Sequence, residues 1–192
     1  MRKALFAAAT VLPLLAAAAG DVFDFIPQGG RTLLAGALSA RPEPADAQAL
    51  LSGRRKREEW LAWLNGRRDA MAGLKPLDDK QLLTLADYLA FNMPLATGKT
   101  PAQPTRANWE KALPPDGRDL ALNYCQGCHI ITVVVTQQRT KEAWLGSLGK
   151  PSHVQIRLSP AQREALASYL VINAAIPIDE VPEELRAGGA TY

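Results

Sequence analysis

The sequence predicts an all-α fold, and two similar segments carry that prediction. The segments "LKPLDDKQLLTLADYLAFN" and "IRLSPAQREALASYLVIN" both place apolar residues at helical spacing behind a residue that can cap a helix. The only β-like run is "IITVVVT", residues 130–136. The 192-residue chain has the apolar fraction, 47%, of an ordinary globular protein, and it can form one medium domain or two small ones.

Residues 1–20 have the order of a secretory signal peptide. A basic start at Arg2 and Lys3 precedes an apolar stretch that ends in small residues. The alternative is an uncleaved anchor helix, but the run contains Pro13 and is short for a bilayer. We therefore expect a periplasmic protein with no membrane span in the mature chain. Loss of Arg2 and Lys3 lowers the formal charge by two, from +3 to +1, and no nucleic-acid partner is expected.

Two irregular stretches divide the chain. Residues 21–44 show no sustained hydrophobic period, which predicts an arm with a short apolar patch around Leu33 to Leu38. Residues 97–117 contain four prolines, which exclude a long helix there.

The regions around these stretches resemble each other, which indicates an internal duplication. Asp78 and Ser159 are predicted N-caps, each followed three residues later by glutamine, which completes a capping box. Upstream, "REEWLAWL" matches "KEAWLGSL". Two amphipathic helices can look alike by chance, but the shared order of a Trp-Leu helix and a capped Tyr-Leu helix favours duplication. The identical pairs include Trp60/Trp144, Leu77/Leu158, Tyr88/Tyr169 and Asn92/Asn173.

The two units differ in one segment, which holds both cysteines and one of the two histidines of the chain. The second unit has "CQGCHIITVVVTQQRT" where the first has only "SGRRKRE". The segment was either inserted in the second unit or lost from the first, and in both cases Cys125, Cys128 and His129 are an addition to a helical scaffold.

Three chemistries compete for these residues. On a helical turn, positions i, i+3 and i+4 share a side, so two thiols can bind the haem vinyl groups while His129 reaches the iron. A zinc site could use Cys125, Cys128, His129 and His153, although adjacent ligands would strain a tetrahedron. A redox dithiol would follow a β-strand in a βαβ unit, and no strand is predicted before Cys125. The spacing favours haem.

With this motif, the sequence resembles the class I c-type cytochromes. "GRDLALNYCQGCH" is similar to their N-terminal helix and haem-attachment motif, and "LSPAQREALASYLVIN" to their C-terminal helix. The resemblance covers residues 108–180 and, more faintly and without the motif, residues 45–96. It implies two tandem cytochrome c-like lobes, of which only the second binds one haem c, through Cys125 and Cys128, with His129 as the proximal iron ligand.

The distal ligand departs from the family pattern. The family commonly uses a methionine downstream of the motif, but Met1, Met71 and Met93 all lie upstream, and the latter two are expected to be core or loop residues. His153 lies where the family places that ligand, so we expect it on the iron. The alternative is a solvent-facing histidine. Paired histidines would lower the reduction potential relative to His/Met, and an open site would suggest ligand binding.

The expected function is one-electron transfer, either as a free carrier or as the cytochrome subunit of a periplasmic dehydrogenase. A haem-based sensor or peroxidase-like enzyme with an open sixth site is the alternative, and an electron-transfer protein is expected in preference to an enzyme. The basic run Arg54 to Arg57 could steer an acidic redox partner. The expected organisation is a signal peptide (1–20), an arm (21–44), a haem-free helical lobe (45–96), a linker (97–107), a cytochrome c domain (108–182) and a C-terminal tail (183–192).

Overall fold

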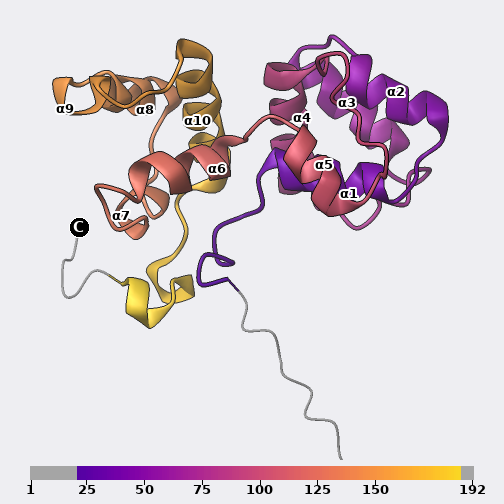
Figure 1. Ribbon diagram of the computed structural model, residues 1–192. Helices are drawn as coiled ribbons and strands as arrows, with labels where there is room; N and C mark the ends of the chain where they lie inside the picture. Colours follow the sequence, from indigo (N-terminus) through magenta and orange to yellow (C-terminus); the bar gives the residue numbers. More distant parts are fainter. Residues whose placement is uncertain (1–20, 187–192) are drawn as a thin grey trace, which may run out of the picture.

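The computed structural model describes residues 21–186, so the predicted signal peptide lies outside the described residues (Figure 1). This part of the chain is helical and contains no strand, which confirms the all-α prediction. The helices are α1 (Gly30–Ser39), α2 (Pro44–Ser52), α3 (Arg57–Arg67), α4 (Asp79–Asn92), α5 (Arg106–Ala112), α6 (Gly117–Leu120), α7 (Thr132–Val135), α8 (Lys141–Leu148), α9 (Pro151–Val154) and α10 (Pro160–Asn173). A π-helical turn, Ala121–Cys125, continues α6, and two short 3₁₀ turns, Ile178–Glu180 and Glu183–Leu185, follow α10.

The helices form two lobes, each with its own hydrophobic core. The N-lobe comprises α1 to α5, and the C-lobe comprises α6 to α10 (Figure 1). The β-like run at residues 130–136 forms the short helix α7 of the C-lobe, because no second strand is available to pair with it.

The expected arm at residues 21–44 is wrong, since it contains α1, a helix of the N-lobe core. This helix buries Leu33, Leu34, Ala35, Ala37 and Leu38. It is only ten residues long and its N-cap, Gly29, has no side chain, so the sequence shows no capping signal at its start. The expected start of the second domain at residue 108 is also too early, because Trp109 and Leu113 pack in the N-lobe core.

The duplication extends beyond the segments that reveal it in the sequence. Both capping boxes form: Asp78 accepts from the Gln81 N–H at 2.8 Å, and Ser159 accepts from the Gln162 N–H at 3.2 Å. In each lobe the first helix crosses the capped helix at a glycine. A Cβ on Gly30 would lie 2.1 Å from the Cβ of Tyr88, and one on Gly117 would lie 2.1 Å from the Cβ of Tyr169. Neither crossing has room for a side chain.

The lobes exchange equivalent contacts across their interface. The Tyr88 hydroxyl donates to the carbonyl of Pro114 at 2.8 Å, and the Tyr169 hydroxyl donates to that of Pro27 at 2.6 Å. Pro27 and Pro114 each lie three residues before the crossing glycine of their own lobe. These paired bonds give the interface a pseudo-twofold arrangement.

The segments that precede α1 and α6 are exchanged in the same way. Arg31 donates to the Glu110 carbonyl at 2.9 Å, and Arg118 donates to the Phe23 carbonyl at 2.8 Å. Ile26 packs in the C-lobe core, and its counterpart Leu113 packs in the N-lobe core. Each lobe therefore completes the core of the other.

Asp116 caps two helices at the centre of this interface. Its carboxylate accepts from the Asp119 N–H of its own helix at 3.0 Å and from the Arg31 N–H of α1 at 2.8 Å. The N-cap of α1 is Gly29, where a Cβ would lie 2.0 Å from the Asp116 carboxylate. The glycine thus admits a cap supplied by the other lobe.

The buried Asp116 predicts a specific pH dependence of stability. The side chain of Asp116 is 3% exposed, and this burial, together with the negative charge of Asp119, raises the pKa of Asp116 to about 6. The backbone N–H groups that donate to Asp116 and the charge of Arg31 act in the opposite direction. A carboxyl whose folded pKa is raised stabilises the fold below its unfolded pKa, and that contribution is lost as the pH rises through about 6. Between pH 4 and 7, wild type should lose roughly 2 to 3 kcal/mol of unfolding free energy relative to Asp116→Asn. Urea titrations at both pH values measure this difference, and parallel pH profiles would contradict it.

Candidate functional site

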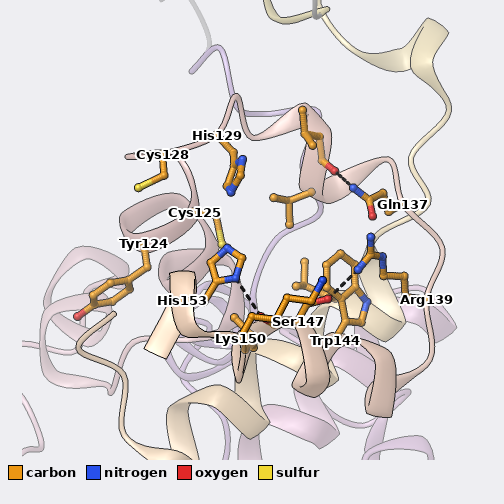
Figure 2. A pocket seen from close by; sticks show the side chains of 14 residues that line it. Tyr124, Cys125, Cys128, His129, Gln137, Arg139, Trp144, Ser147, Lys150 and His153 are labelled. Atoms are coloured by element: carbon orange, nitrogen blue, oxygen red, sulfur yellow. Dashed lines mark hydrogen bonds between the residues drawn. The ribbon is translucent and has the colours of Figure 1, made fainter. Parts of the chain in front are cut away.

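The C-lobe contains a cavity of about 210 Å³ into which the predicted site residues converge (Figure 2). Cys125, Cys128, His129 and His153 all line it. These side chains come from two places in the sequence. Cys125 ends the π-helical segment, with Cys128 and His129 in the turn that follows, and His153 lies in the short helix α9 between α8 and α10.

The cysteine segment is one helical turn, as its spacing predicts. The backbone N–H of His129 donates to the Cys125 carbonyl at 2.9 Å, and that of Cys128 donates to the same oxygen at 3.2 Å. The Gln126 side chain accepts from the Ile131 N–H at 2.8 Å and closes the turn. Cys125 is half-buried, Cys128 is exposed, and both are free thiols. The turn therefore presents both sulfurs and the imidazole to one cavity.

The environment of the thiols disfavours a redox dithiol. Burial, with a smaller effect of Cys128, raises the pKa of the Cys125 thiol to about 11. Reactive dithiols have a lowered thiol pKa, because the thiolate is the nucleophile. A helical segment, not a strand, also precedes Cys125. Neither feature is that of a thioredoxin-like motif.

The imidazole rings of His129 and His153 lie near each other, and both line the cavity. Their ring centroids are 6.0 Å apart (Figure 2). A metal–imidazole bond is about 2 Å long, and a ring nitrogen lies roughly 1.1 Å from its centroid, given C–N bonds of about 1.33 Å. Two imidazoles on opposite sides of one iron therefore have centroids roughly 6 Å apart, as observed here.

The orientation of His153 is set by a hydrogen bond. Its Nδ1 lies 2.9 Å from the Ser147 carbonyl oxygen. A carbonyl can only accept, so Nδ1 carries the proton and Nε2 keeps the free lone pair. This arrangement is typical of metal-ligating histidines.

The zinc alternative finds no support in this geometry. Within residues 21–186, no group of three or more His, Cys, Asp or Glu side chains is placed to hold a metal ion. The methionines of the described part are also remote from the cavity. Met71 and Met93 belong to the N-lobe core at 2% and 9% exposure, as expected of core residues.

Two cavity residues have a role that the sequence did not reveal. The Nε1–H of Trp144 is buried without a hydrogen-bond partner in the described chain. The Arg139 guanidinium stacks over this indole, 5.1 Å from its centroid, and donates to the Ser147 hydroxyl at 2.8 Å. Buried donors usually have a hydrogen-bond partner, so an acceptor in the cavity could satisfy this N–H. The only available signal was the repeated spacing of Arg55/Trp60 and Arg139/Trp144, where Arg55 also stacks on Trp60.

The residues present fit the group that the resemblance implies. Two thiols on one turn can form thioethers, and two opposed imidazoles can bind an iron from both sides. Trp144 and Arg139 can bind a propionate. Val134, Leu148 and Leu170 supply an apolar wall.

Comparison with known proteins assigns no family or function to the chain. No helix among residues 21–186 has the length and apolar character needed to cross a membrane. Searches of protein-family models, curated proteins and solved structures find no match to this chain.

Proposed function

We propose that the C-lobe carries one covalently bound haem c and that the protein transfers single electrons between redox partners. The observation that carries this proposal is the pair of histidine rings, 6.0 Å apart, facing a cavity that Cys125 and Cys128 also line. The family resemblance of residues 108–180 points to the same group.

Each residue has a distinct part in this proposal. Cys125 and Cys128 form the thioether links, His129 is the proximal ligand and His153 is the distal ligand. When bound, the haem supplies a one-electron couple. The hydrogen bond from His153 Nδ1 to Ser147 holds the ring in the ligating tautomer. With His129 and His153 both available as protein ligands, the site would suit electron transfer in preference to ligand chemistry.

The surface near the site supports contact with a protein partner. Cys128 and Ile130 are exposed beside His129, with Ile130 at 47% exposure. Arg139 and Lys150 line the cavity, and no carboxylate side chain is among its lining residues. An acidic redox partner, such as a periplasmic dehydrogenase subunit, would complement this charge. Periplasmic export remains a proposal based on residues 1–20.

A haem-based sensor is the second candidate, and one observation favours it. Helix α9, which carries His153, buries none of its residues. A weakly anchored ligand could leave the iron and admit a small molecule.

Absorption spectra of the ferric and ferrous holoprotein, with and without carbon monoxide, separate the two functions. Electron transfer predicts six-coordinate low-spin spectra that the gas does not change within minutes. An immediate ferrous–carbonyl spectrum would favour the sensor, and a protein without haem absorption would refute both.

A further inference from the structure

The segment that carries His153 is attached to the C-lobe by the apolar contact of Ile156 and by hydrogen bonds from Arg163. Helix α9 buries no residue, and Val154 is 61% exposed. Arg163, in the first turn of α10, donates to four backbone carbonyls, one before α9, two within it and one after it. The acceptors are Leu148 at 2.6 Å, Ile156 at 2.8 Å, His153 at 3.3 Å and Val154 at 3.4 Å.

These bonds use the particular geometry of arginine. The planar guanidinium presents five N–H donors in a fixed fork, so one side chain can bind several carbonyls at once. The Leu148 carbonyl lies at the C-terminus of α8, where backbone acceptors lack helical partners and a positive charge is favourable. The neighbouring Ser147 carbonyl accepts from His153 Nδ1. Arg163 therefore binds the same helix end that orients the imidazole.

The N-lobe anchors the equivalent loop differently. In the register that aligns Leu77 with Leu158, Arg163 corresponds to Leu82, which is fully buried. Met71 and Leu74 of that N-lobe loop are buried, whereas their counterparts Ser152 and Gln155 are exposed. The C-lobe loop borders the cavity and keeps one apolar contact with the core, at Ile156. Arg163 of α10 adds a polar attachment there.

We propose that Arg163 is a positioning residue that holds the His153 segment over the cavity and thereby keeps His153 on the haem iron. The inference rests on the proposed function. Arg163 does not line the cavity, so it acts through the backbone of residues 148–156.

The test uses ferrous holoprotein and measures the rate of carbon monoxide binding, since the gas enters only when His153 leaves the iron. Arg163→Ala should bind at least tenfold faster than wild type. Arg186→Ala is the matched control: Arg186 also donates to backbone carbonyls, of Asp179 and Val181, but lies outside the cavity. Its rate should equal that of wild type. A wild-type rate in Arg163→Ala would overturn the inference.

Two further variants keep the outcomes distinguishable. Arg163→Lys retains the charge but not the fork, and should give a rate between those of wild type and Arg163→Ala. A wild-type rate in Arg163→Lys would overturn the requirement for the guanidinium fork, because the charge alone would then suffice. His153→Ala should bind the gas fastest. If His153→Ala binds carbon monoxide no faster than wild type, the assignment of His153 as iron ligand in the proposed function fails. If His153→Ala binds the gas fast while Arg163→Ala does not, only the role of Arg163 fails.

Hydrogen exchange separates positioning from general destabilisation. In Arg163→Ala holoprotein, the amides of residues 152–156 should exchange faster, while those in the second half of α10 keep their wild-type rates. A uniform increase over the C-lobe would contradict a local role.

Discussion

Replacing Cys125 and Cys128 with alanine is expected to abolish covalent haem attachment. These are the only cysteines of the chain, so no other thiol can substitute for them. After denaturing electrophoresis, the wild-type band should show haem-dependent peroxidase staining, and the band of the double variant should show none. The effect is all-or-none because staining under denaturing conditions requires a covalent bond.

Gly127→Ala is the control for a general disturbance of the motif. A Cβ on Gly127 meets no atom within 4 Å, so this variant should stain like wild type. Persistent staining of the double alanine variant would refute thioether attachment at this turn.

Substituting His153 should change the midpoint potential of the haem. Methionine as an axial ligand raises the potential relative to histidine, so His153→Met should raise it by an amount on the order of 100 mV. His153→Ala should instead give a high-spin ferric spectrum. Spectroelectrochemical titration measures the first effect, and ferric absorption spectra measure the second.

Val154→Met provides the matched control for His153→Met. It places the same thioether one residue away, on a side chain that is exposed and does not line the cavity. Its potential should equal that of wild type. If His153→Ala remains low-spin with an unchanged potential, another residue ligates the iron, and Lys150 of the cavity wall becomes the best candidate.

The features that the sequence predicts well depend on residues close together in the chain. The capping boxes at Asp78 and Ser159 form as predicted, because cap and partner are three residues apart. The same holds for the turn from Cys125 to His129. His153 was expected in a loop, and it lies in the single-turn helix α9 within that connection, in the cavity.

The features that the sequence does not predict depend on contacts between distant segments. Helix α1 has no local start signal, because its N-cap is Gly29, which has no side chain to cap it. The cap that Asp116 supplies to α1 joins residues 85 positions apart, and no local pattern signals it. The exchange of Ile26 and Leu113 between the two cores likewise has no local signature.

The residues of the candidate site also divide into those that a local pattern predicts and those that depend on distant contacts. The thiols and histidines follow from residue type and spacing. Trp144 is predicted from the sequence to be an ordinary core residue, and only the structure shows that its unpaired Nε1–H lies at the cavity. Arg163 reads as a solvent-exposed position of an amphipathic helix. Its four carbonyl acceptors emerge only in the folded chain, where the backbone of residues 148–156 lies within reach of its side chain.

The intact mass of the denatured wild-type protein tests the central claim most directly. The protein should be produced in a bacterial periplasm that contains haem-attachment machinery and then unfolded in acid before mass spectrometry. The account predicts the mass of the polypeptide plus one haem, with both thiols of Cys125 and Cys128 resistant to alkylation. The bare polypeptide mass, with both thiols alkylated, would contradict it.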